Sequence, residues 1–157
     1  NEQELKIIIK NIYNKYKTID ILINNAAVQV SKSFEKYSCV EWKKIMENNY
    51  IGTCNMIYYV SKLMKSHSTI LNISSVHSYK PRKNKYAYDC SKSAIDMLTK
   101  ELALELADKN ITINSLSFGA VNTEMNDIWK NNLDLKIQAK SKVPLKIIFE
   151  HIQITVK

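Results

Sequence analysis

The expected fold is decided by the stretch Thr69-Ile70-Leu71-Asn72-Ile73-Ser74-Ser75, an apolar run closed by two serines. Near-continuous apolar runs of this kind are typical of parallel strands buried between layers of helices. A similar short run, Ile19-Asp20-Ile21-Leu22-Ile23, precedes this stretch, and the run Ile111-Thr112-Ile113-Asn114-Ser115-Leu116 follows it. We therefore expect three strands that belong to one parallel sheet.

Apolar residues at helical spacing fill the segments around these strands. The chain opens on an amphipathic helix with apolar side chains at Leu5, Ile8, Ile9, Ile12, Tyr13 and Tyr16. Another helix is expected from about Tyr86 to Ala107. The alternation of helix and strand predicts an α/β fold: a partial, doubly wound, Rossmann-like parallel sheet flanked by helices in three α/β/α layers. We expect residues 1–157 to form a single incomplete domain of this type.

A long middle helix is expected between the first two strands. Ser38 and Glu41 have the spacing of a capping box, in which each side chain accepts a hydrogen bond from the backbone N–H of the other residue. The inner stripe of this helix holds Trp42, Ile45, Met46, Thr53, Met56, Ile57, Val60, Leu63 and Met64. Asn49 lies on the same stripe and should have partners, because a buried amide without them costs about 1–3 kcal/mol. A last helix, Leu145 to Val156, is expected after Pro144.

Composition argues against a membrane or secreted protein. With 45% hydrophobic and 24% charged residues, the chain resembles an ordinary globular protein. No apolar run approaches the roughly 20 residues that span a bilayer. The first residues, Asn-Glu-Gln-Glu-Leu, do not form a signal peptide. We therefore expect a cytoplasmic protein with no membrane partner.

Cysteine usage and the net charge of +8 limit the kinds of ligand. Cys39, Cys54 and Cys90 are widely spaced and odd in number, so we expect reduced thiols and neither a disulfide nor a metal site. The lysines are spread along the chain, and no motif indicates nucleic-acid binding. The densest basic segment, residues 80–85, is interpreted as solvated, with a phosphate-bearing ligand as the alternative.

Tyr88 and Lys92 form the first candidate catalytic pair. At a separation of four residues in one helix, the phenol and the ammonium group lie on the same helical face. Tyrosine ionises near pH 10 in water, and a cation beside it favours the phenolate. Such a shift would prepare Tyr88 for general acid–base work. The same spacing is common on solvated helix faces, so the pair needs support from its surroundings.

The carboxyl ends of the strands bring further polar groups toward this pair. Ligands in open α/β sheets bind at this edge. The three strands end at Asn24-Asn25, Ser74-Ser75 and Phe118-Gly119. Ser75 is therefore expected to converge with Tyr88 and Lys92 on one cleft, which Asn49 reaches from the middle helix. The group predicts proton transfer to or from a substrate oxygen.

Together these motifs resemble the short-chain dehydrogenase/reductase family. The matching segments are Asn24-Asn25-Ala26-Ala27, Asn48-Asn49-Tyr50-Ile51-Gly52, Asn72-Ile73-Ser74-Ser75, Tyr88-Asp89-Cys90-Ser91-Lys92 and residues 114–123. Ser75 lies thirteen residues before Tyr88, as the family's serine does before its tyrosine. The resemblance covers nearly the whole chain and is weakest beyond Asn126.

The resemblance implies a role for each matching residue. Tyr88 is the acid/base group for hydride transfer between a carbonyl and a secondary alcohol, and Ser75 positions the substrate oxygen. Lys92 lowers the pKa of Tyr88 and holds the nicotinamide ribose, while Asn49 anchors a water of a proton relay. The residues implied to bind NAD or NADP are Asn25, Ala26, Ala27, Tyr88, Lys92, Phe118, Gly119, Val121 and Thr123. The implied partner is a small-molecule carbonyl or alcohol, and a complete homologue would be a homo-oligomer.

Three departures from the family pattern affect the cofactor site. Ala27 replaces the usual glycine, and Phe118 replaces the usual proline. The sequence has only two glycines, Gly52 and Gly119, and therefore no Gly-rich loop for a cofactor pyrophosphate. We interpret the chain as a fragment of a reductase in which cofactor binding is impaired and turnover is absent. The alternative is a non-catalytic remnant that acts as a helix-mediated interaction module.

Overall fold

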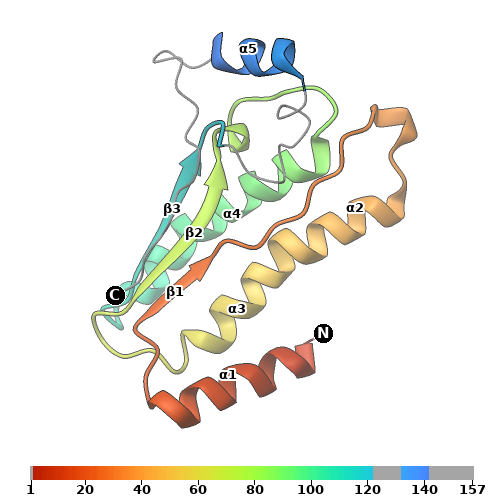
Figure 1. Ribbon diagram of the computed structural model, residues 1–157. Helices are drawn as coiled ribbons and strands as arrows, with labels where there is room; N and C mark the ends of the chain where they lie inside the picture. The colour runs from red at the N-terminus through yellow and green to blue at the C-terminus, as the bar shows by residue number, and fades with distance from the viewer. Residues whose placement is uncertain (1, 122–131, 142–157) are drawn as a thin grey trace. The chain divides into compact units, whose positions relative to one another are not determined.

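The computed structural model describes residues 2–121 and 132–141 (Figure 1). The chain divides into two compact units, residues 1–117 and residues 118–157. The described part of the second unit contains helix α5 (Leu133–Ser141). The expectation of one incomplete domain over residues 1–157 stays a prediction.

The described helices and strands alternate as the sequence predicts. The strands are β1 (Ile21–Asn24), β2 (Thr69–Ser75) and β3 (Thr112–Phe118). The helices that accompany them are α1 (Glu2–Tyr16), α2 (Cys39–Met46), α3 (Gly52–Val60) and α4 (Tyr86–Ala107). Shorter turns lie at η1 (Phe34–Lys36), η2 (Glu47–Ile51) and η3 (Val76–Ser78). The predicted order of helix and strand is confirmed over this part of the chain.

The three strands form one sheet in the order β1-β2-β3. β1 pairs with β2 in parallel, from Ile21 opposite Thr69 to Asn24 opposite Asn72, and the three arrows in Figure 1 point the same way. Both crossovers step across the sheet in the same direction, and crossovers between parallel strands are right-handed. Helices α3 and α4 therefore lie on the same face of the sheet.

The core lies between the sheet and this layer of helices. Helix α1 packs against α3, and α4 packs against α2 and η2. The register places Leu22 beside Ile70, and both pack with Ile57 and Val60 of α3 and with Ile9 of α1. All five side chains are buried, and burying a side chain of this size is worth about 1.5–3 kcal/mol. This apolar layer supports the strand ends that carry the polar groups.

The capping box predicted at Ser38 and Glu41 begins helix α2. The Ser38 hydroxyl accepts a hydrogen bond from the Glu41 N–H at 3.2 Å, and Glu41 Oε2 accepts one from the Ser38 N–H at 3.0 Å. The pKa of Glu41 is lowered to about 2. The hydrogen bond from Lys32 is the largest cause, and the hydrogen bonds from Ser38 add to it. The start of the middle helix is therefore fixed by its own side chains, as predicted.

The middle helix contains one turn that is wider than an α-turn. Helices α2 and α3 are continuous through η2, a π-turn in which the Gly52 N–H bonds to the Glu47 carbonyl five residues back. Thr53 Oγ1 donates a hydrogen bond to the Asn49 carbonyl at 2.7 Å within this widened turn. Single π-turns of this kind are frequent at functional sites. The predicted long helix is confirmed over residues 39–60. The π-turn within it is not predicted, because apolar periodicity over so few residues does not separate a π-turn from an α-turn.

The two ends of the chain also differ from the expectation. In α1 only Ile9 is buried, whereas Ile8 is 56% exposed, because the helix packs against α3 along a narrow stripe. Helix α5 is not predicted from the sequence, because the apolar residues of Leu133–Ser141 do not recur at helical spacing. Its residues Leu133 and Ile137 are exposed. The predicted helix from Leu145 to Val156 lies outside the described residues.

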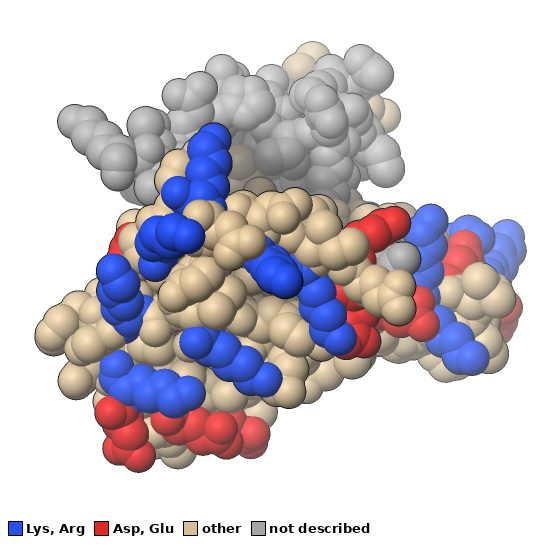
Figure 2. Space-filling view, turned by 90° about the horizontal axis from the view of Figure 1, so that it is seen from below, with Lys and Arg blue, Asp and Glu red and all other residues tan. Residues whose placement is uncertain are grey.

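Charged side chains are interspersed on the face shown in Figure 2. Lysine and arginine side chains are spread over much of this face among uncharged residues, some of them side by side, and acidic side chains lie at the lower edge and toward the right of the view. A surface of mixed charges keeps a protein hydrated without presenting a continuous basic stripe. This face agrees with the interpretation of the +8 net charge as general solvation.

Candidate active site

Ser75, Tyr88 and Lys92 lie together at the carboxyl end of β2. Ser75 is the last residue of β2, and Tyr88 and Lys92 are one turn apart near the start of α4. The Tyr88 phenol is hydrogen-bonded to the Ser75 side chain, and Lys92 Nζ lies 5.6 Å from the centroid of the Tyr88 ring. The predicted proximity of the three side chains is therefore observed, while their roles stay predictions.

Lys92 is the buried cation of this group. The residue is 2% exposed, and its Nζ donates a hydrogen bond to the Ile73 carbonyl of β2 at 2.6 Å. Burial lowers the pKa of Lys92 from 10.5 to about 8, and the Asp96 charge opposes this change. An ammonium group has three N–H donors, and within the described residues Ile73 is its hydrogen-bond acceptor. The remaining donors suit a ligand that carries hydroxyl groups, such as a ribose.

The pKa of Tyr88 moves in the direction opposite to the prediction. Burial of the phenol raises the pKa of Tyr88 above its ordinary value of 10.0. The Arg82 charge and the Ser75 hydrogen bond oppose the rise, and the Asp89 charge adds to it. The predicted lowering of the Tyr88 pKa is therefore wrong in this structure, because desolvation of the phenolate outweighs the Arg82 charge and the Ser75 hydrogen bond. Tyr88 is held in its protonated form at neutral pH.

Ser75 is fixed in place by the turn that follows it. The residue is buried and extended, and its Oγ accepts a hydrogen bond from the His77 N–H at 3.2 Å, which caps η3. A serine hydroxyl has two acceptor lone pairs and one donor. Oγ can therefore hold the cap of η3 and the contact with the Tyr88 phenol at the same time. The hydroxyl is positioned before any ligand binds.

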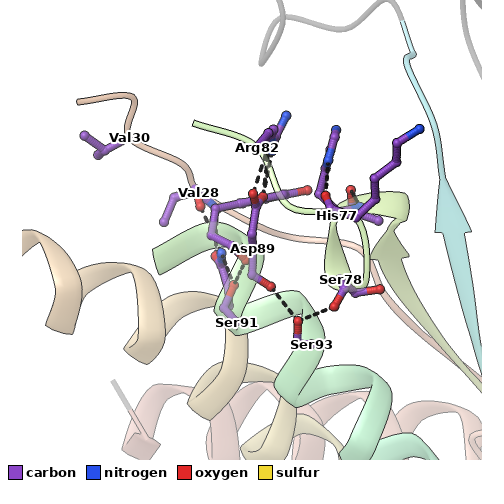
Figure 3. A network of polar contacts seen from close by, with 12 residues as sticks. Val28, Val30, His77, Ser78, Arg82, Asp89, Ser91 and Ser93 are labelled. Carbon is purple, nitrogen blue, oxygen red and sulfur yellow. Dashed lines mark hydrogen bonds and ion pairs between the residues drawn. The ribbon is translucent and has the colours of Figure 1, made fainter. Parts of the chain in front are cut away.

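Asn49 joins three separate parts of the chain. Its side chain is fully buried. Oδ1 accepts a hydrogen bond from the Val28 N–H at 2.8 Å. Nδ2 donates one hydrogen bond to the Val28 carbonyl at 2.9 Å and another to Ser91 Oγ at 3.0 Å. Ser91 Oγ donates in turn to the Tyr88 carbonyl at 2.7 Å; Val28 and Ser91 are labelled in Figure 3. The expectation that this buried amide has partners is confirmed.

A second chain of buried amides is not among the features that the sequence predicts. Asn24 Nδ2 donates to Asn72 Oδ1 at 2.8 Å, and Asn72 Nδ2 donates to Thr99 Oγ1 at 2.9 Å. The chain ends where Thr99 Oγ1 donates to the Ile95 carbonyl at 2.7 Å. It connects β1, β2 and α4. The sequence does contain a signal for it, since Asn24 and Asn72 are polar positions at the ends of apolar runs.

Arg82 and Asp89 form an ion pair that the sequence does not indicate. Arg82 Nη2 lies 3.0 Å from Asp89 Oδ1, and Arg82 Nε contacts both carboxylate oxygens at 3.2 and 3.3 Å. Both side chains are mostly buried. Arg82 lies in the loop between η3 and α4, whereas Asp89 lies seven residues later within α4. Helical spacing does not extend through a loop, so the sequence does not predict that the two residues pair.

The residues expected to bind the cofactor fall in different parts of the chain. Asn25 and Ala26 are exposed and line a pocket of about 420 Å³ bounded by β1, α1, η2 and α3, and Ala27 is half-buried. The later group, Phe118, Gly119 and Val121, belongs to the second unit. Thr123 lies outside the described residues. The assignment of this group to the nicotinamide therefore stays a prediction.

Comparison with known proteins identifies the relatives of this chain. The family model described as short chain dehydrogenase matches residues 1–134. The chain belongs to this family. It is 30% identical over 147 residues to the 3-oxoacyl-acyl-carrier-protein reductase FabG of Aquifex aeolicus (strain VF5), covering 92% of the chain and 58% of that relative. It is 31% identical over 149 residues to glucose 1-dehydrogenase 2 of Bacillus subtilis (strain 168), covering 92% and 57%.

Solved structures of the family share the fold. A dehydrogenase/reductase from Sinorhizobium meliloti 1021 superposes with a TM-score of 0.88 at 22% identity, over 96% of this chain and 59% of its own. The Pseudomonas aeruginosa RhlG/NADP active-site complex gives a TM-score of 0.88 at 23% identity, over 96% and 61%. These likenesses confirm a partial Rossmann-like α/β fold. The chain spans less than two thirds of the length of each of these family members.

No helix in the described ranges has the length and apolarity to cross a membrane.

Asn49→Ala should lower the free energy of unfolding by about 1–3 kcal/mol, because it removes the hydrogen bonds that the fully buried amide makes with Val28 and Ser91. Urea denaturation of both proteins measures this loss. Asn48→Ala is the matched control, since Asn48 is exposed and bonds only within its own helix; it should change stability by less than about 0.5 kcal/mol. Equal decreases in the free energy of unfolding of the two variants would show that the hydrogen bonds of the buried Asn49 amide do not stabilise the fold more than those of an exposed one.

The lowered pKa of Lys92 predicts a specific pH dependence of stability. Between pH 8 and 10.5 the folded protein loses the Lys92 proton before the unfolded chain does, so the free energy of unfolding from this group rises with pH. Lys92→Met removes the contribution. The difference in unfolding free energy, wild type minus variant, should therefore increase across this window in urea titrations. A difference that stays flat would contradict a buried Lys92 with a lowered pKa.

Proposed function

We propose that the protein is an NAD(P)-dependent oxidoreductase that interconverts a carbonyl and a secondary alcohol by hydride transfer. The observation that carries this proposal is the contact of the Tyr88 phenol with the Ser75 hydroxyl, beside the buried Lys92 ammonium, at the carboxyl end of a parallel strand. Membership of the short chain dehydrogenase family supports it. The names of two relatives, a 3-oxoacyl-acyl-carrier-protein reductase and a glucose dehydrogenase, support a small-molecule carbonyl or alcohol as the substrate.

In this mechanism Tyr88 moves the proton and Ser75 orients the substrate. The Ser75 hydroxyl hydrogen-bonds the carbonyl oxygen, and the Tyr88 hydroxyl donates its proton to the same oxygen as the alcohol forms. A bound nicotinamide cofactor supplies the hydride. Burial raises the pKa of Tyr88, so the phenol carries the proton that carbonyl reduction requires at neutral pH.

Lys92 is the residue of this group best suited to hold the cofactor. Its ammonium is fixed to the Ile73 carbonyl, which leaves donors for the hydroxyl groups of the nicotinamide ribose. The pyrophosphate end of such a cofactor has no comparable seat among the described residues. Gly52 lies inside a helix and Gly119 is an isolated glycine after β3, whereas a phosphate-binding turn needs several glycines before a helix.

We therefore expect the polypeptide of residues 1–157 to bind NADH and NADPH weakly and to show no turnover by itself. Titration of each cofactor, followed by its fluorescence, measures this directly. Micromolar binding by this polypeptide would contradict the expectation that the Gly-rich loop is required.

The assignment of Tyr88 is tested in a chimera that places a strand followed by a Gly-x-x-x-Gly-x-Gly phosphate-binding turn before residue 1. The chimera should oxidise NAD(P)H in the presence of carbonyl substrates, and Tyr88→Phe should reduce that rate by about 10²–10⁴-fold, as expected for loss of an acid–base group. An active chimera that keeps its full rate after the Tyr88→Phe substitution would refute the role of Tyr88.

A second role, helix-mediated self-association, is favoured by the outer face of α4. Cys90, Met97 and Leu104 are exposed and recur every seven residues, so they lie along one stripe of this helix. Leu104 is 79% exposed. Exposed apolar stripes on a helix commonly mark protein interfaces. We propose that a second copy of the chain covers this stripe.

Leu104→Glu should convert a dimer to a monomer in sedimentation velocity experiments, because it places a carboxylate in the apolar stripe. Ile8→Glu is the matched control, since Ile8 is exposed on α1, away from α4; it should leave the dimer intact. A monomeric wild type, or equal effects of both substitutions, would overturn the proposed interface.

A further inference from the structure

Arg82 is held by Asp89 in a geometry that only arginine provides. The guanidinium contacts both carboxylate oxygens through Nε and Nη2, at 3.0 to 3.3 Å. Figure 3 shows the two side chains facing each other across the start of α4. Such a fork fixes the orientation of arginine as well as its distance. Asp89 is itself anchored to α4, where its carbonyl accepts a hydrogen bond from Ser93 Oγ at 3.0 Å.

This fixed guanidinium lies against the ring of Tyr88. Arg82 Cζ is 5.5 Å from the ring centroid, and Lys92 Nζ is 5.6 Å from the same point. Both distances are within the range of cation–π contacts. Tyr88 is therefore flanked by two cations, one from the loop before α4 and one from α4 itself.

The two cations differ in how long they keep their charge as pH rises. An arginine stays protonated throughout the range in which proteins remain folded. Burial lowers the pKa of Lys92 to about 8, so its charge is lost at mildly alkaline pH. Arg82 is then the positive charge that remains beside the phenol. The carboxylate of Asp89, next to Tyr88 in sequence, acts on the phenol in the opposite sense.

We propose that Arg82 is a positioning residue for Tyr88, and that the Arg82–Asp89 pair sets how readily the phenol gives up and regains its proton. This inference rests on the proposed acid–base role of Tyr88. It gives one member of the basic segment 80–85 a partner within the protein, whereas the sequence alone favours solvation of that whole segment. Lys83, in the same segment, is exposed.

Other ionisable groups and hydroxyls around the pair come from several elements. The end of β2 contributes the Ser75 hydroxyl, which bonds the phenol. The loop before α4 contributes Lys85, whose pKa is lowered by burial and by the Arg82 charge. The Tyr37 phenol responds to Asp89 from the segment before α2, and burial raises its pKa. Asp96 acts on Lys92 rather than on Tyr88. Arg82 and Asp89 are the charged residues in this group whose charges bear on Tyr88.

The test follows the ionisation of Tyr88 itself in the 157-residue chain. Tyrosine labelled with ¹³C at Cζ gives one NMR signal per tyrosine, and Tyr88→Phe assigns the signal of Tyr88. Arg82→Gln should raise the pKa of Tyr88, because it removes a positive charge that favours the phenolate. Asp89→Asn should lower it, because it removes a negative charge that disfavours the phenolate. Arg82→Lys keeps the charge without the fork and should raise the pKa less than Arg82→Gln.

The opposite signs separate an electrostatic role from a merely structural one. Loss of local packing alone would move the pKa of Tyr88 in the same direction in Arg82→Gln and Asp89→Asn, and this result would overturn the proposal. Lys83→Gln removes a charge from the same loop and should leave the Tyr88 signal unchanged; a shift equal to that of Arg82→Gln would also overturn it. If Arg82→Gln does not fold, Arg82→Lys should still raise the pKa of Tyr88 and Asp89→Asn should still lower it, so the opposite directions can be tested with these two variants.

This measurement does not depend on turnover. The two experiments can therefore give different answers. If the pKa shifts of Tyr88 have opposite signs but the active chimera keeps its rate after Tyr88→Phe, the acid–base role is refuted and the effect of the Arg82–Asp89 pair on the phenol stands. An active, Tyr88-dependent chimera without these shifts would leave the function standing and refute the role of Arg82.

Discussion

The buried amide of Asn49 is the interaction on which the arrangement of the site depends. It lies at a π-turn in the middle helix and uses its oxygen and both of its amide hydrogens on Val28 and Ser91. A polar group in this position costs free energy unless every bond is made. The loop after β1, the middle helix and the start of α4 must therefore lie in the one arrangement that gives the Asn49 side chain all of its hydrogen bonds.

That placement carries through to the candidate catalytic side chains. Ser91, which bonds Asn49, also bonds the Tyr88 carbonyl, and Lys92 bonds the Ile73 carbonyl at the end of β2. The Lys92 bond thus holds the start of α4 against the strand, and the Ser91 bond, which lies within α4, ties the first turns of this helix to Asn49. A site fixed in this way is preorganised, because its side chains are ordered by the fold before any ligand arrives.

The sequence predicts most of the regular structure, because apolar periodicity and capping chemistry are local. It identifies the three strands, the capping box at Ser38 and the need for partners at Asn49. It misses what depends on neighbours that are distant along the chain. The rise in the pKa of Tyr88 comes from burial, which the spacing of Tyr88 and Lys92 does not reveal. The Arg82–Asp89 pair depends on how a loop folds back, and helix α5 lacks the apolar stripe by which helices are recognised.

The amide chain from Asn24 through Asn72 to Thr99 has a consequence for how the sheet tolerates mutation. A parallel pair slipped by one residue would turn Asn24 to the opposite face from Asn72 and break the chain. The same slip would also turn Leu22 away from the buried face that it shares with Ile70 and bring the exposed Ile21 there, so the apolar core rejects it as well. The amide chain adds a separate requirement, because a substitution at Asn24 or Asn72 would leave a polar partner unpaired even in a correctly aligned sheet.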